Sequence, residues 1–160
     1  MRMSTDESRD LGLAVATIAA AAEAGVTVFD TARAYGLGEA DLGHNEKLLA
    51  SALRQCGADA TARIVTKGGM TRPDGRWISD GRAKAILADC EASLTALEGL
   101  DIDLYLVHAP DPRTRGEPPS ARWPGSRTKA SSGALACRTS TAVSSTKRSR
   151  SPRLPPSRLR

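Results

Sequence analysis

Four residues that can take part in proton transfer lie at or just beyond the ends of short apolar runs: Asp30, Tyr35, Lys67 and His108. An ammonium group near a phenol stabilises the phenolate, which makes the phenol a better proton donor near neutral pH. A carboxylate can pair with the lysine, and an imidazole can orient a carbonyl oxygen or relay a proton. The set therefore suits carbonyl reduction, in which a hydride is added to carbon and a proton to oxygen.

Each of these residues also has a structural interpretation when it is taken alone. An Asp at the end of a strand is commonly a turn former or helix cap. Tyr35 can be a rim residue, Lys67 a solvated charge and His108 a hydrogen-bonded core residue. Only their joint position at the ends of three successive strands favours the catalytic interpretation.

Alternating strands and helices must position this set. The expected strands begin at residues 26, 63 and 102, and this regular spacing indicates a β-α array with parallel strands and right-handed crossovers. Polar groups at the carboxyl ends favour an α/β barrel over a doubly wound sheet, and no G-x-G-x-x-G sequence follows any strand. We expect strands over 26–29, 63–66 and 102–107, and helices over 11–24, 45–55 and 80–98.

Three local features give further expectations. Ser4 and Glu7 fit a capping box for the first helix, and Gly25 supplies its C-terminal stop. Asp89 is expected on a solvated face of the third helix. Trp77 lies in a loop rich in Gly and Pro, where packing as a lid is a more common role than binding a ligand.

The charge divides the 160-residue chain into two unequal parts. Residues 1–111 hold 11 Lys and Arg against 17 Asp and Glu, whereas residues 112–160 hold 12 against one, a net charge of +11. The second part is also poor in Leu, Ile, Val and Phe, so we expect a disordered basic tail. Because a complete (β/α)8 barrel needs about 250 residues, only part of one fits.

The cysteine pattern and hydropathy bear on the cellular compartment. Cys56, Cys90 and Cys137 are odd in number and lack the spacing of metal ligands, so we expect reduced thiols and no metal site. No signal-peptide pattern is present, and no run reaches the ~20 apolar residues of a membrane span. These features predict a cytoplasmic protein.

The motifs around the four residues closely resemble those of the aldo-keto reductases, over roughly residues 8–111. That family folds as a (β/α)8 TIM barrel and reduces aldehydes and ketones with NADPH. The resemblance implies that Tyr35 is the proton donor, that Lys67 and Asp30 tune it, and that His108 orients the substrate carbonyl. The matching motifs are Phe-Asp-Thr-Ala-Arg-Ala-Tyr-Gly (29–36), Gly-His-Asn-Glu (43–46), Val-Thr-Lys-Gly-Gly (65–69) and Asp-Ile-Asp-Leu-Tyr-Leu-Val-His (101–108).

The sequence departs from the family pattern at both ends. No strand precedes the first helix, and nothing recognisable as strands 5 to 8 follows residue 111. We therefore expect about three β-α units, with the first strand and the C-terminal half of the barrel missing. Most of the family's nucleotide-binding positions lie in that half, so no cofactor-binding residue is assigned here.

Residues 112–160 have three interpretations: a nucleic-acid-binding tail, a solvated extension without a role, and a frameshifted version of the missing half. Net charge attracts phosphate, but Trp123 is the only aromatic residue there that could stack on a base, so nucleic-acid binding is disfavoured. Back-translation of residues 121–150 into a shifted frame can give a segment similar to the family's sixth strand, which favours the frameshift. Sequencing the DNA around codon 112 decides this.

Two functions remain open for the chain. The first is an NADPH-dependent oxidoreductase that acts on a small carbonyl compound. The alternative, favoured for the chain as written, is a truncated and catalytically inactive remnant, because an incomplete barrel leaves open sheet edges.

Overall fold

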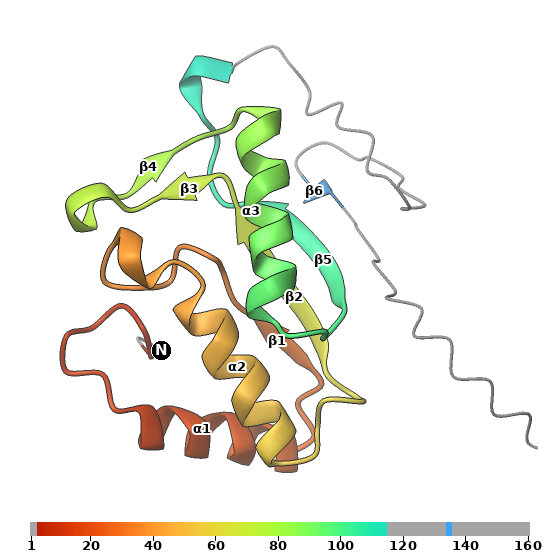
Figure 1. Cartoon of the computed structure of the whole chain (residues 1–160). Helices are drawn as coiled ribbons and strands as arrows, with labels where there is room; N and C mark the ends of the chain where they lie inside the picture. Colours follow the sequence, from red (N-terminus) through yellow and green to blue (C-terminus); the bar gives the residue numbers. More distant parts are fainter. Residues whose placement is uncertain (1–2, 115–133, 136–160) are drawn as a thin grey trace, which may run out of the picture.

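The computed structural model describes residues 3–114 and 134–135. Helices and strands alternate through most of this part of the chain (Figure 1). The strands are β1 (Val28–Asp30), β2 (Arg63–Gly68), β3 (Met70–Thr71), β4 (Ile78–Ser79), β5 (Ile102–Val107) and β6 (Ala134–Leu135). The α-helices are α1 (Leu11–Glu23), α2 (His44–Gln55) and α3 (Ala83–Ala96), with short 3-10 turns at Glu39–Asp41, Pro73–Gly75 and Pro112–Thr114.

The main sheet has the strand order β1-β2-β5-β6. β1, β2 and β5 are parallel, which confirms the parallel array, and β6 pairs antiparallel with β5. β1 and β2 place Asp30 opposite Val65, and β2 and β5 place Gly68 opposite Val107. The carboxyl ends of the three parallel strands therefore meet at one edge of the sheet.

Figure 1 shows α2 and α3 in front of the strands, on one face of this sheet, with α1 beside α2. Side chains that point to the helices, such as Ile64, Ile102 and Tyr105, are fully buried. On the opposite face Val28 remains 54% exposed. A doubly wound sheet would carry helices on both faces, so the one-sided cover is consistent with a segment of a (β/α)8 barrel.

β2 ends at Gly68, where neighbouring side chains leave no room for a larger residue. A Cβ atom there would lie 2.8 Å from the Cβ of Asp89 and would overlap the hydroxyl of Tyr105. Tyr105 itself is fully buried. Gly68 thus allows β2 to run close beneath α3 directly after Lys67.

The start of α1 differs from the expected capping box. The side chain of Asp10 accepts a hydrogen bond from the backbone N–H of Leu13 at 3.0 Å and caps the helix. Ser4 is instead buried, and the amide of Asn45 donates to its hydroxyl at 2.8 Å. Gly25, with φ +89°, follows the helix and confirms the expected stop.

The remaining expectations about local structure have mixed outcomes. Cys56 and Cys90 are reduced thiols, as expected, while Cys137 lies outside the described residues. The structured part extends to at least Thr114, because Pro112–Thr114 forms a 3-10 turn. Otherwise the expectation of a disordered tail over 112–160 lies outside the described residues, apart from the backbone of Ala134–Leu135.

Candidate active site

Three strand ends bring the sequence-predicted residues together. Asp30 is the last residue of β1, Lys67 is the next-to-last residue of β2, and His108 directly follows β5. Tyr35 follows β1 by five residues and comes from the loop that leads to α2. Because the strands are parallel and in register, all four residues lie at the carboxyl edge of the sheet.

The ammonium group of Lys67 is the hub of this cluster. It donates to Oδ2 of Asp30 at 2.6 Å and to the carbonyl of Thr31 at 3.0 Å, and its third neighbour is the hydroxyl of Tyr35 at 3.5 Å. An ammonium has three N–H donors, so these three oxygens use its full capacity. The lysine side chain is 15% exposed and the aspartate side chain 56% exposed. The positive charge is therefore enclosed, while its carboxylate partner faces solvent.

Backbone hydrogen bonds fix the loop that carries Tyr35. The N–H of Thr31 donates to the carbonyl of Val65 at 2.8 Å, and the N–H of Arg33 donates to the carbonyl of Lys67 at 3.1 Å. The N–H of Tyr35 then donates to the carbonyl of Ala32 and closes a turn. The loop thus continues the pairing of β1 with β2, and the position of Tyr35 is tied to the backbone of Lys67.

His108 packs edge-on against Tyr35, with 5.5 Å between ring centroids and 87° between ring planes. Its Nδ1 atom is buried and has no hydrogen-bond partner among the described residues. Burial is the main cause that lowers the pKa of His108, the charge of Lys67 lowers it further, and Asp30 opposes these effects. The imidazole is therefore neutral near pH 7 and can offer one N–H donor.

Trp77 belongs to the same cluster, although the sequence indicated only a packing lid. Its ring lies 5.7 Å from that of His108 and 6.5 Å from that of Tyr35, both edge-on. The side chain comes from the connection between β3 and β4, an antiparallel hairpin in the segment expected to be a loop. Trp77 is 48% exposed, so it forms one wall of the site and remains open to solvent.

The expectation for Asp89 is wrong. Its side chain accepts hydrogen bonds from the backbone N–H of Gly69 and from Nε of Arg33, each at 2.8 Å. Asp89 thereby links α3 to the end of β2 and to the loop that carries Tyr35. A signal was present in the sequence, because two successive glycines after Lys67 expose backbone N–H groups that need an acceptor.

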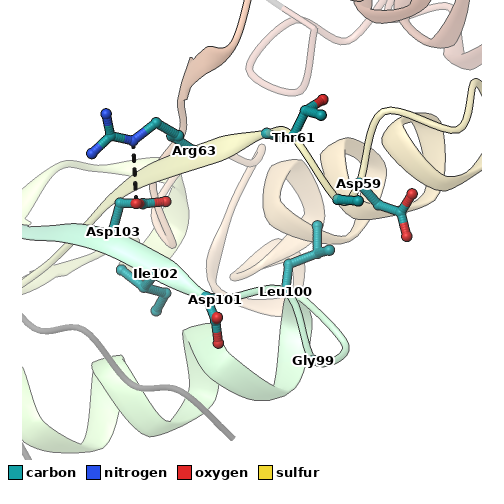
Figure 2. A pocket seen from close by; sticks show the side chains of 10 residues that line it. Asp59, Thr61, Arg63, Gly99, Leu100, Asp101, Ile102 and Asp103 are labelled. Atoms are coloured by element: carbon teal, nitrogen blue, oxygen red, sulfur yellow. Dashed lines mark hydrogen bonds and ion pairs between the residues drawn. The ribbon is translucent and has the colours of Figure 1, made fainter. Parts of the chain in front are cut away.

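Two hollows lie at opposite ends of the parallel strands. One, of about 380 Å³, adjoins Asp30 and Tyr35 and includes Ser4 and Asn45 in its wall. The other, of about 620 Å³, lies where β2 and β5 begin, and Figure 2 shows Arg63 and Asp103 paired across these strands. The larger hollow contains none of the four predicted residues, so we place the candidate site at the smaller one.

Neither a metal centre nor a membrane-spanning helix is found in the part of the chain that the structure describes. No cluster of three or more His, Cys, Asp or Glu side chains there could hold a metal ion. None of the described helices is both long and apolar enough to cross a membrane.

Helices cover only one face of the sheet, and an acid, an amine, a phenol and an imidazole meet at its carboxyl edge. This combination of fold and site is expected for an aldo-keto reductase barrel. The family model "Aldo/keto reductase family" matches residues 3–144, which is most of the chain and extends beyond the expected limit of 111. The chain therefore belongs to the aldo/keto reductase family.

Known relatives agree with this assignment. Aldo-keto reductase YhdN of Bacillus subtilis (strain 168) is 33% identical over 98 residues, which cover 61% of this chain and 28% of that protein. A Pseudomonas aeruginosa structure assigned to the aldo-keto reductases is 32% identical with a TM-score of 0.56, covering 68% of this chain and 39% of that one.

A third relative is aldo-keto reductase AKR11C1 from Bacillus halodurans in its holo form, at 27% identity and a TM-score of 0.57. The match covers 71% of this chain and 36% of that one. The chain thus spans well under half the length of each of these relatives.

Proposed function

We propose that this chain carries the proton-transfer site of an NADPH-dependent oxidoreductase that reduces a small aldehyde or ketone to an alcohol. The observation that carries the proposal is the position of the Tyr35 hydroxyl, 3.5 Å from a lysine ammonium that is itself paired with Asp30. Family membership supports the same chemistry. The four residues Asp30, Tyr35, Lys67 and His108 then have distinct roles.

Tyr35 is the proton donor in this proposal. As the carbonyl carbon is reduced, negative charge develops on the carbonyl oxygen, and the phenol gives its proton to that oxygen. The phenolate left behind is stabilised by the ammonium of Lys67, which Asp30 holds in position. The neutral imidazole of His108 donates a hydrogen bond to the same carbonyl oxygen and orients it.

The residues around Tyr35 fit the reactive end of a nicotinamide cofactor. The adjoining hollow of about 380 Å³ is in the size range of small-ligand pockets. Its wall includes Asn45, whose amide is held in place by hydrogen bonds with Ser4 and Thr31. When bound, NADPH supplies the hydride that reduces the carbonyl carbon. No residue is assigned to the remainder of the cofactor.

Substitution of the proton donor tests the proposal. Tyr35→Phe keeps the ring and its contacts but removes the proton, so we expect kcat to fall by about 10²- to 10⁴-fold with an aromatic aldehyde and NADPH. Lys67→Met should give a loss of similar size, since the phenolate then has no neighbouring cation. The measurement is the loss of NADPH absorbance in steady state.

Lys47→Met is a matched control, because Lys47 is an exposed lysine on α2 and is not one of the four site residues. It should leave kcat unchanged. The double variant Tyr35→Phe/Lys67→Met should be no slower than the slower single variant, because residues that act as a unit are not additive. A rate close to that of the parent in either single variant would refute the assigned roles.

An inactive remnant is the second candidate, and one observation favours it. Val28 of β1 is 54% exposed on the face of the sheet opposite to the helices, and Val26, just before the strand, is 45% exposed. Exposed apolar strands favour association over catalysis. Titration with NADPH, followed by the fluorescence of Trp77 and Trp123, separates the two, because saturable binding supports the enzyme and its absence supports the remnant.

The cellular location is also a proposal. The reduced thiols of Cys56 and Cys90 support a reducing compartment such as the cytoplasm, because cysteines of secreted proteins are commonly joined in disulfides.

A further inference from the structure

Arg72 is a buried cation whose side chain is hydrogen-bonded entirely to backbone carbonyls. It is 6% exposed. Its Nε and both terminal nitrogens donate to four carbonyl groups, and all five N–H donors of the guanidinium are used. Among the described residues no Asp or Glu forms an ion pair with it. The guanidinium of Arg72 therefore does not serve to neutralise a buried Asp or Glu among these residues.

The carbonyls belong to two segments that are far apart in sequence. One terminal nitrogen donates to the carbonyls of Ala34 at 3.2 Å and Gly36 at 2.7 Å, on either side of Tyr35. The other donates to Leu37 at 3.3 Å and to Gly75 at 2.8 Å. The guanidinium therefore joins the backbone that carries Tyr35 to the tight turn in the β3–β4 hairpin.

The same guanidinium also contacts the aromatic wall of the site. Its central carbon lies 3.8 Å from the centroid of the Trp77 ring, a cation–π contact. Trp77 in turn meets Tyr35 and His108 edge-on. One buried side chain thus fixes both the loop of the phenol and the ring that borders it.

We propose that Arg72 is a positioning residue that holds Tyr35 and Trp77 in a fixed relation at the site. This inference rests on the proposed function for its effect on turnover, while its effect on Trp77 is independent of that function. Arginine is required, because the single nitrogen of lysine has three donors and cannot reach both segments in the forked geometry.

The experiment uses the full chain with Trp123→Phe, which leaves Trp77 as the sole tryptophan. Arg72→Met and Arg72→Lys are compared with Arg76→Met, a control in the same hairpin whose side chain is 68% exposed. Emission spectra and acrylamide quenching report the surroundings of Trp77. Far-UV circular dichroism and thermal unfolding show whether each variant is folded at the assay temperature.

Both Arg72 variants should shift the emission of Trp77 to longer wavelength and increase its quenching, whereas Arg76→Met should match the parent. For the folded protein, kcat should fall by about 10- to 100-fold, because small displacements of a reacting group have effects of this size. KM should change by much less. A merely structural role would lower the unfolding temperature and leave both kcat and the Trp77 spectrum of the folded protein unchanged.

The outcomes separate the two proposals. If Tyr35→Phe retains the parent rate, or the parent shows no turnover, the proposed function fails, and the spectrum of Trp77 still decides the role of Arg72. If Trp77 responds in both Arg72 variants but kcat does not, while Tyr35→Phe is inactive, the positioning of Tyr35 by Arg72 is refuted. If Arg72→Lys matches the parent in every readout, the forked guanidinium is not needed and the inference is overturned.

Discussion

Lys67 and Asp30 form an ion pair whose members differ in exposure, because the ammonium is enclosed and the carboxylate is largely exposed. Ion pairs with an exposed member contribute little stability, about 1 kcal/mol or less. The pair is better explained by orientation, since the carboxylate and the carbonyl of Thr31 direct the third N–H of Lys67 toward Tyr35. At the scale of single residues, the site is organised for geometry more than for stability.

His108 gives a pH prediction at this scale. Its pKa is lowered in the folded protein, mainly by burial, so the unfolded chain binds a proton more readily. The contribution of His108 to stability is therefore complete above the usual histidine pKa of about 6.5 and is lost as pH falls through the folded value. In the His108→Gln variant the free energy of unfolding should therefore fall less as pH decreases. The measurement is urea unfolding between pH 5 and 8.

The chain contains two histidines, so His44→Gln leaves His108 as the sole imidazole for NMR titration. A midpoint at or above 6.5 would contradict the predicted direction.

Helix α2 is attached to the sheet through a buried acid. Glu46, in the first turn of α2, is fully buried, and Thr66 of β2 donates a hydrogen bond to its carboxyl group at 2.5 Å. Burial raises the pKa of Glu46, and the hydrogen bond from Thr66 opposes this only in part. Helix α2 is thus anchored to the sheet by a carboxyl group, that of Glu46, which is costly to ionise.

Glu46→Gln tests this anchor. A raised folded pKa means that the stability due to Glu46 is complete below its unfolded value and is lost as pH rises through the folded value. Glutamine keeps the acceptor for Thr66 without the charge, so it should increase the free energy of unfolding at pH 8 by about 1 kcal/mol or more. The gain should shrink toward pH 5, as measured by urea unfolding.

Glu39→Gln, at an exposed position, is the control and should change little at either pH. Equal gains from Glu46→Gln at both pH values would exclude a buried charge as the cause.

The elements differed in how far the sequence could predict them. β5 was predicted with its full bounds, because an apolar run lies between Gly99 and His108. The hairpin of β3 and β4 was missed, since two-residue strands carry no recognisable alternation. The role of Arg72 was missed because its hydrogen-bond partners are backbone carbonyls in distant segments, which a side-chain pattern does not reveal. The role of Asp89 was missed because helical periodicity alone placed it toward solvent, although the glycines after Lys67 offered a signal. The four predicted site residues were found because strand ends in a parallel sheet share one edge.

At the scale of the whole molecule, the described part of the sheet has one helix-covered face and one open face. β1 pairs with β2 and, among the described strands, has no other neighbour. Val26 and Val28 expose apolar surface on or beside this edge strand. The interpretation of residues 112–160 as a frameshifted segment stays a prediction for DNA sequencing.

The open face predicts association between copies of the chain. Val28→Lys places a charge on it and should reduce concentration-dependent association in sedimentation velocity. Leu13→Lys is the matched control, because Leu13 is also an exposed hydrophobic residue but lies on α1. An equal effect from both substitutions would show that the sheet face is not the contact.

The tight packing over Gly68 restricts how this rim can be redesigned. Its neighbours Tyr105 and Asp89 occupy the space into which any Cβ would project. Before position 68 can be varied, Tyr105 must therefore be replaced by a smaller residue and α3 must shift to relieve the contact with Asp89. In directed evolution, variants that change position 68 before this space is made would be lost because they do not fold.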